Sequence, residues 1–246
     1  MPHTSDALPP TRISPMGWIQ TLSIFGLTAL LLFAATGFLI PAFSDASGSE
    51  PVLSWFMVGG LGVFAPLVIA GYVLLRRESK FGEQSRWATR LRFRRMDRVD
   101  WLWGVGAIAA IGTLSATIHA ALGTLEGGVD LHPQFMAFEP LSAGRYWILA
   151  AWIPFWILNI MGEEFLWRGV ILPRQEAALG RGAWVANAFG WLLFHLAFGW
   201  QLMVVLLPIL IILPYAVQHR QNTWVGVVIH AGVNGPGFVA VALGYV

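Results

Sequence analysis

Two adjacent carboxylates and an arginine interrupt a long apolar stretch of the chain at Glu163, Glu164 and Arg168. Each Asp, Lys or Arg at the centre of a membrane helix costs roughly 2.5–3.5 kcal/mol, whereas each Leu or Ile returns only about 0.3–0.6 kcal/mol. Such groups are therefore tolerated where they face the protein interior, pair with one another or line a wet cavity. Ionisable residues inside a membrane segment indicate a functional site by default.

Helical spacing divides these three residues into a pair and a single carboxylate. Residues four apart share a helix face, so Glu164 and Arg168 can form an ion pair with the acid N-terminal to the base, which is the favoured order. Glu163 points about 100° away from Glu164 and stays available to a cavity. The competing interpretation is a plain interhelical charge cluster without chemistry.

Two other apolar stretches carry histidine. His195 lies four residues after Trp191, and His230 lies four residues before Asn234. The imidazole of His230 and the amide of Asn234 therefore share one stripe of a helix, where two polar groups need partners from the bundle. For each histidine taken alone, a hydrogen-bonded packing role is the alternative.

The depths of these groups can be compared by counting residues from the predicted inner ends of their helices. With about 1.5 Å of rise per residue, Glu163 lies roughly 14 Å deep, His195 roughly 18 Å and His230 roughly 10 Å. A carboxylate, two imidazoles and an amide would then meet in the inner half of the membrane. Such a set is suited to activating water.

Ser115 and His119 are a weaker candidate. They lie four residues apart and could form a nucleophile and its base, but neither an orienting acid nor an oxyanion signature accompanies them. We therefore predict that both are helix-packing polar residues. No catalytic role is expected for Asp130, His132, His3 or His219.

The elements that must position the candidate residues are membrane helices, because 57% of the 246 residues are hydrophobic and only 11% are charged. The absence of cysteine excludes disulfides, thiolate metal ligands and a cysteine nucleophile. The predicted fold is all-α, a polytopic membrane helix bundle of about seven transmembrane helices, with short amphipathic helices between them. The predicted spans are residues 18–40, 52–75, 101–122, 146–173, 183–200, 202–217 and 223–246. Residues 1–16 are a polar N-terminal tail, and residues 17–246 are a single transmembrane domain.

Basic residues indicate the orientation of the bundle. Nine Lys and Arg residues lie between Arg76 and Arg98, so the positive-inside rule predicts a cytoplasmic loop at residues 76–100 and a cytoplasmic N-terminus. A patch at residues 76–98 for anionic lipid is the second interpretation of this cluster. We expect an integral, multi-pass protein of a prokaryotic inner membrane. Its expected partners are a peptide or protein substrate and the lipid bilayer, with no nucleic acid.

The polar residues resemble, in their order, the motifs of a known family. The sequence Glu163-Glu164 with Arg168, then His195, then His230 with Asn234 resembles EExxxR, FxxxH and HxxxN of the CPBP family. These are the CAAX-protease and bacteriocin-processing intramembrane endopeptidases, also called Abi proteins. The resemblance covers about residues 145–240, the predicted catalytic part.

The resemblance implies hydrolysis of a peptide bond within the membrane, and it implies a role for each matching residue. Glu163 would be the general base for water, His195 would help to position that water, His230 and Asn234 would stabilise the oxyanion, and Glu164 and Arg168 would be a supporting pair. The substrate could be a prenylated CAAX tail, a leader peptide or a sorting signal. The sequence does not distinguish these three.

Two features qualify the resemblance. Trp191 occupies the aromatic position where the family usually has Phe, and we expect this exchange to alter the shape of the pocket rather than its chemistry. No cofactor is expected, although Glu163, His195 and His230 would make a reasonable zinc ligand set. The HExxH pattern of zinc proteases, the GxGD pattern of aspartyl intramembrane proteases and the Gly-flanked Ser of rhomboid proteases are all absent.

Two functions from other classes compete with an endopeptidase. A non-catalytic membrane scaffold could keep the polar cavity in order to bind a partner's helix or tail, but the intact set of catalytic groups argues against it. A proton-coupled transporter could use the same carboxylates and imidazoles as a relay. The absence of evident repeats or paired broken helices argues less strongly against the transporter.

Overall fold

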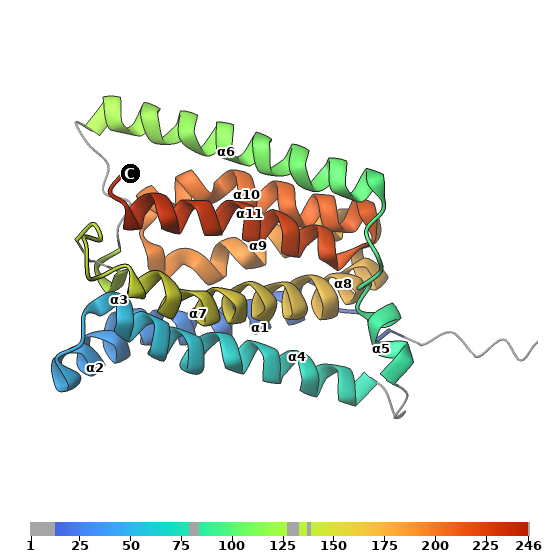
Figure 1. Cartoon of the computed structure of the whole chain (residues 1–246). Coiled ribbons are helices and arrows are strands. Elements are labelled where there is room, and N and C mark those ends of the chain that lie inside the picture. Colours follow the sequence, from blue (N-terminus) through green and yellow to red (C-terminus); the bar gives the residue numbers. More distant parts are fainter. Residues whose placement is uncertain (1–12, 79–83, 127–132, 137–138, 246) are drawn as a thin grey trace, which may run out of the picture.

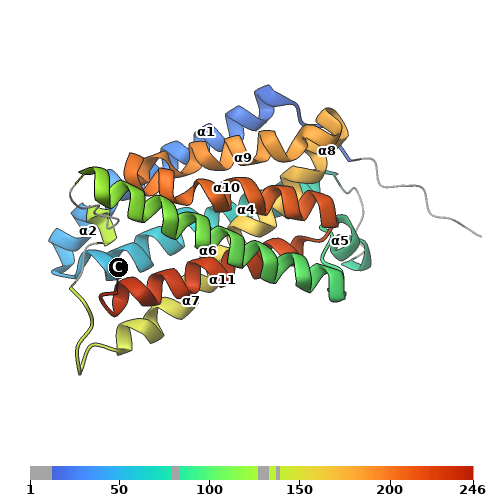
Figure 2. The same cartoon turned by 90° about the horizontal axis from the view of Figure 1, so that it is seen from above.

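The computed structural model describes residues 13–78, 84–126, 133–136 and 139–245, and within these ranges the chain is helical, with no strand. The long helices lie side by side along one direction (Figure 1), and the view from above shows them in more than one layer (Figure 2). The predicted all-α membrane bundle is therefore confirmed. The predictions for His3, Lys80, Asp130 and His132 lie outside the described residues.

The helices are α1 (Trp18–Ala34), α2 (Ile40–Ser47), α3 (Pro51–Ser54), α4 (Ala65–Glu78), α5 (Gln84–Arg90), α6 (Arg98–Glu126), α7 (Trp147–Glu163), α8 (Leu172–Leu179), α9 (Ala183–Phe194), α10 (Trp200–Arg220) and α11 (Thr223–Ala242). They are joined by the π-helical segments η1 (Ala35–Leu39), η2 (Trp55–Phe64) and η4 (Glu164–Ile171) and by the 3₁₀ turns η3 (Gln134–Met136), η5 (Gly180–Gly182) and η6 (His195–Phe198).

Six stretches of the described chain are long and apolar enough to cross a membrane. The fourth, Trp147–Phe198, reverses direction at η5, so that α7 and α9 run antiparallel (Figure 1). These two passes and the five other stretches together agree with the prediction of about seven spans. Helix α9 contains only 12 residues, or about 18 Å of rise, which is shorter than the roughly 30 Å hydrocarbon core of a bilayer. The predicted span at residues 183–200 is thus interrupted at His195.

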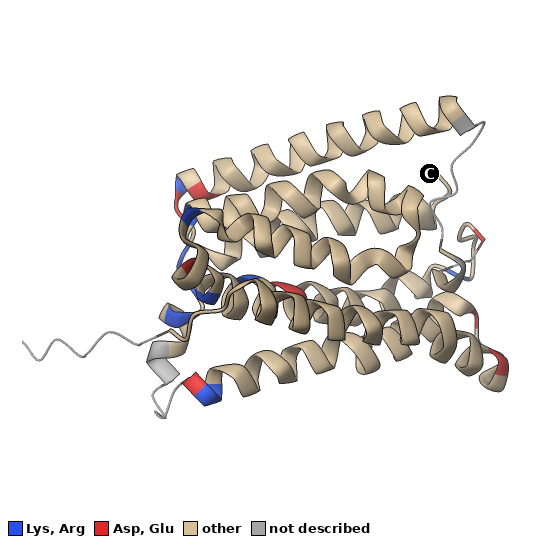
Figure 3. Ribbon diagram, turned by 180° about the vertical axis from the view of Figure 1, so that it is seen from behind, with Lys and Arg blue, Asp and Glu red and all other residues tan. Residues whose placement is uncertain are grey.

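Most of the basic residues lie at one end of the bundle. Figure 3 shows Lys and Arg gathered at one end, with a further pair of basic and acidic stretches inside the bundle. We call the first region the basic end and define it by Arg90, Arg94, Arg174 and Arg220. At the opposite end Arg145 pairs with Glu50 and thereby joins the start of α7 to the start of α3. The gathering of basic residues at one end agrees with the predicted basic loop at residues 76–100, and its cytoplasmic orientation stays a prediction.

Much of the predicted basic loop is folded against the bundle. Helix α4 continues to Glu78, beyond the predicted end at residue 75, and α5 begins at Gln84. Arg90 contacts both carboxylate oxygens of Glu78, at 2.8 and 2.9 Å, and donates to the backbone carbonyls of Gly169 and Val170 at 3.1 and 3.2 Å. The basic loop therefore anchors the end of η4. Binding of anionic lipid by this loop stays a prediction.

Close backbone approaches set the positions of the two central helices. A Cβ at Gly162 would lie 3.0 Å from the carbonyl oxygen of Phe64, so α7 packs directly on the backbone of η2. A Cβ at Gly190 would lie 2.3 Å from the Phe25 ring, so α9 packs equally closely on α1. Because a side chain at either glycine would force the helices apart, these positions fix where α7 and α9 present their polar residues.

Candidate active site

The two carboxylates lie at the junction of α7 and the π-helical segment η4. Glu163 is the last residue of α7, Glu164 is the first of η4, and both are buried, with 1% and 0% of their surface exposed. Glu164 Oε1 accepts a hydrogen bond from Arg168 Nη1 at 3.0 Å, and Arg168 is also 0% exposed. The predicted ion pair is confirmed, and it is wholly internal.

The Glu163 carboxylate is held by two helices. Its Oε1 accepts from the side-chain amide of Asn159 at 2.9 Å, and its Oε2 accepts from the indole N–H of Trp191. Asn159 precedes Glu163 by four residues on α7, whereas Trp191 comes from α9. Because the two donors approach from different elements, the plane of the carboxylate is defined by tertiary packing as well as by its own helix.

His195 lies at the point where α9 ends and η6 begins. Its Nδ1 lies 2.9 Å from the backbone carbonyl of Trp191. A carbonyl oxygen only accepts, so this contact assigns the proton to Nδ1 and leaves Nε2 of the neutral ring as an acceptor. His195 is 7% exposed, deep among aromatic rings.

His230 and Asn234 come from α11 and reach the two carboxylates by different routes. The depth comparison places His230 in the same layer as Glu163, and its Nδ1 lies 3.0 Å from Oε1 of the adjacent Glu164. Asn234 donates to Asn159 Oδ1 at 3.4 Å, and Asn159 in turn donates to Glu163. The structure therefore brings the predicted residues of three helices into one polar cluster.

Trp191 lies at the centre of this cluster. The Arg168 guanidinium carbon lies 3.7 Å from the centroid of its ring, a cation–π contact, and the rings of His195 and His230 meet it edge-on at 5.5 and 5.3 Å. We predicted that the exchange of Phe for Trp changes shape alone, and that prediction is wrong in one respect. The indole N–H donates to Glu163, which a phenyl ring could not do.

Part of the cluster's hydrogen-bonding capacity is unused. Glu164 Oε2 and the Nε and Nη2 atoms of Arg168 are buried and have no hydrogen-bond partner in the described part of the chain. The close approach of α11 explains the crowding at Glu164, since a Cβ at Gly226 would lie 2.4 Å from its Oε2. Buried polar groups without partners are uncommon, and each one calls for an explanation.

The side chains of Glu163, His195 and His230 are not arranged as ligands of one zinc ion. Among the described residues no three His, Asp or Glu side chains group closely enough to hold one metal ion. Both oxygens of Glu163 face N–H donors, and His230 Nδ1 is directed at Glu164. This arrangement does not fit a three-ligand zinc site as it stands. That the protein needs no cofactor stays a prediction, with zinc as the alternative, and no step below is routed through a metal.

Sequence reasoning missed two residues of the cluster, Asn159 and Gly226. The spacing of Asn159 and Glu163 is the same four-residue interval that identified Glu164 with Arg168, so the signal for Asn159 was present. Nothing in the sequence marks Gly226, because its role depends on the helix that packs against it. Ser115 donates to the carbonyl of Val205 at 2.8 Å, which agrees with its predicted packing role.

A known protein family matches the part of the chain that contains this cluster. Residues 145–235 match the family described as type II CAAX prenyl endopeptidase Rce1-like. This segment, which is less than half of the chain, is similar to an Rce1-like protease domain. It contains all six predicted site residues, and the resemblance to the CPBP and CAAX proteases is confirmed. In general terms the match supports an intramembrane endopeptidase of the CAAX type. Neither the curated proteins nor the solved structures gave a match to the chain.

Proposed function

We propose that the Rce1-like domain hydrolyses a peptide bond of a membrane-associated substrate with water that Glu163 activates. The observation that carries this proposal is the hydrogen-bonded cluster around Glu163, in which α7, α9 and α11 each supply polar side chains inside an apolar bundle. A buried carboxylate beside a neutral imidazole has the groups that general base catalysis requires.

Proton transfer would begin the reaction. Glu163 takes a proton from water while His195 Nε2, an acceptor in the tautomer described above, orients the same water by hydrogen bonding. The oxygen of that water then attacks the carbonyl carbon of the scissile peptide bond. When the bond to nitrogen breaks, the proton held by Glu163 passes to the leaving amine, and the carboxylate is restored.

The attack places negative charge on the carbonyl oxygen, and α11 supplies the donors for it. The hydrogen bond from Asn234 to Asn159 is long, at 3.4 Å, so its amide can turn to an oxyanion at little cost. His230 directs its Nδ1–H at Glu164. When the ring is protonated, its Nε2–H is a second donor, which can reach the oxyanion. Glu164 would stabilise that positive ring while Arg168 fixes Glu164 in place.

The test of the general base is Glu163→Gln in the full-length protein reconstituted into liposomes. Loss of a general base should lower the cleavage rate by about 10²–10⁴-fold. The readout is cleavage of a farnesylated CAAX peptide, together with mass spectrometry of protein termini in membranes from cells that express either form. Glu139→Gln is the matched control, because Glu139 is exposed and lies outside the cluster. Full activity of Glu163→Gln would overturn the mechanism.

The same assays separate the competing functions. We expect His230→Ala to lose cleavage as Glu163→Gln does. A non-catalytic scaffold would give identical protein termini with the wild type, the variants and cells without the protein. A transporter would give proton flux across the liposome membrane without any cleaved product.

Metal dependence can be measured on the same preparation. We expect cleavage to survive exhaustive chelation, and elemental analysis of the purified protein to find no stoichiometric zinc. Loss of activity on chelation that is restored by added zinc would show metal dependence and would contradict the metal-free mechanism.

A further inference from the structure

Trp191 contacts four of the six predicted site residues. Its indole N–H donates to Glu163, its backbone carbonyl accepts from His195, its ring face lies under Arg168, and its ring edge meets His230. A residue that only filled space would not need the contacts of the indole N–H. The position where the family usually has Phe thus carries one side-chain hydrogen bond that Phe could not make, from the indole N–H to Glu163.

The ring of Trp191 has little freedom to move. The residue is 1% exposed, and the preceding Gly190 brings α9 into direct contact with Phe25 of α1. The guanidinium of Arg168 covers one side of the ring at 3.7 Å. Since both the helix and the ring are held, the indole N–H presents a fixed donor direction to Glu163.

We propose that Trp191 is a positioning residue for the reaction. Its indole N–H fixes one oxygen of Glu163, and Asn159 fixes the other, so that the carboxylate presents its remaining lone pairs to water in a single orientation. The backbone carbonyl at the same position of α9 fixes the tautomer of His195, whichever side chain is present. This proposal rests on the proposed function of Glu163 as the general base.

The kinetic test is Trp191→Phe, which keeps an aromatic ring beneath Arg168 and removes the N–H donor together with one ring of the indole. Loss of one hydrogen bond to a charged group should lower kcat about 10–100-fold. KM should stay within about twofold, because Trp191 is not expected to touch substrate. The matched control is Trp184→Phe on the same helix, whose ring packs on Tyr215 and lies outside the cluster, and which should retain wild-type kcat. Wild-type kcat in Trp191→Phe would overturn the proposal.

A spectroscopic test does not depend on activity. In protein labelled with ¹⁵N-tryptophan, the indole N–H signal of Trp191 is assigned by its disappearance in Trp191→Phe. That signal should move when Glu163 is replaced by Gln and stay in place in Glu139→Gln. A signal that is indifferent to Glu163→Gln would show that the hydrogen bond is absent, and would overturn the proposal.

The two tests keep the failures of the two proposals distinguishable. If Glu163→Gln is fully active, or if the wild type produces no cleavage of the farnesylated peptide or of membrane proteins, the proposed function fails. In either case the indole signal still decides whether Trp191 orients Glu163. If Glu163→Gln is inactive and Trp191→Phe is as active as the wild type, the positioning role alone fails.

Discussion

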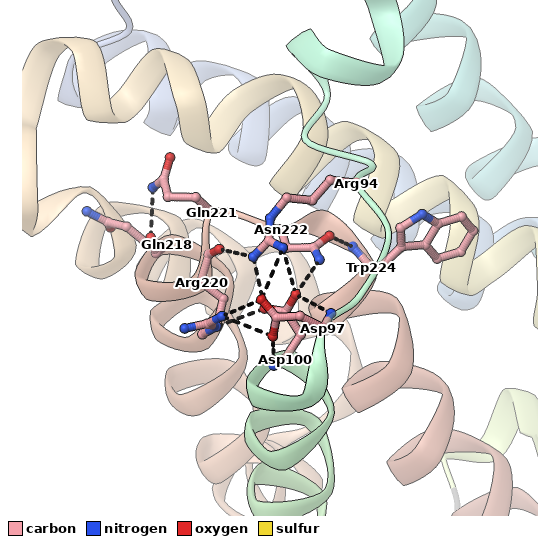
Figure 4. A network of polar contacts seen from close by, with 8 residues as sticks. All are labelled: Arg94, Asp97, Asp100, Gln218, Arg220, Gln221, Asn222 and Trp224. Atoms are coloured by element: carbon pink, nitrogen blue, oxygen red, sulfur yellow. Dashed lines mark hydrogen bonds and ion pairs between the residues drawn. The ribbon is translucent and has the colours of Figure 1, made fainter.

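The protein contains two clusters of buried charge that differ in how completely their hydrogen bonds are satisfied. At the basic end, Asp100 is 0% exposed, and both of its oxygens are occupied (Figure 4). Its Oδ1 accepts from Arg94 at 3.0 Å and from Arg220 at 2.8 Å, and its Oδ2 accepts from Asn222 at 3.0 Å and from the backbone N–H of Asp97 at 3.1 Å. These contacts tie the start of α6 to the loop between α10 and α11.

The interior cluster is as deeply buried but less complete. Glu164 Oε2 and two nitrogens of Arg168 have no hydrogen-bond partner among the described residues, although all three atoms are buried. A saturated network rigidifies a structure, whereas a partly satisfied one is a reservoir of strain or a place for a reacting group. The cluster around Asp100 therefore has the saturation of a structural network, whereas the Glu164–Arg168 pair next to Glu163 does not.

The largest effect on stability is expected from Arg168→Ala. It leaves Glu164 buried with His230 as its remaining partner, and removing one member of a buried pair costs about 3–5 kcal/mol. Protein abundance in membranes and the thermal melting temperature in detergent should both fall. The control is Arg181→Ala, at an exposed position on η5, the turn that follows α8. Normal abundance together with an unchanged melting temperature would show that the pair is not structural.

A smaller loss is expected from Gly226→Ala, which probes the crowding around Glu164. The added methyl would lie 2.4 Å from Glu164 Oε2 and 2.8 Å from Val217. Overpacking of this kind costs about 1–3 kcal/mol, and displacement of Glu164 should also reduce cleavage. Gly237→Ala on the same helix is the matched control, because apart from the adjoining residues and backbone of its own helix no described atom lies within 4 Å of its added methyl. Equal melting temperatures for the two variants would contradict the packing described here.

The smallest effect is expected from Arg94→Ala at the basic end. The Arg94 side chain is 42% exposed, and Asp100 keeps Arg220 and Asn222 as partners. Solvent screening limits such a pair to about 0–1 kcal/mol, and 1 M salt should remove most of that difference. Cleavage activity should be unchanged. A loss of stability as large as that in Arg168→Ala would mean that the two clusters do not differ in the way proposed.

Short-range spacing accounts for most of what could be predicted about the site. The interval from Glu164 to Arg168 gave the ion pair directly, since helical geometry places such residues on one face whatever surrounds them. The same rule applied to Asn159 and Glu163 would have found a further contact. By contrast, the junction of α7 with a π-helical segment and the end of α9 at His195 are breaks in regular helix that periodicity does not reveal.

The sequence by itself determined that this is a membrane helix bundle with buried acidic residues, because the cost of placing charge in lipid is set first by residue type. It also predicted six residues of the polar cluster from their positions on apolar helices, but not Asn159 or Gly226. Only the tertiary structure decided that His230 contacts Glu164 rather than Glu163 and that Trp191 donates to Glu163. Those contacts join helices far apart in the chain, and their geometry follows from close packing at Gly190 and Gly226, which no local pattern encodes.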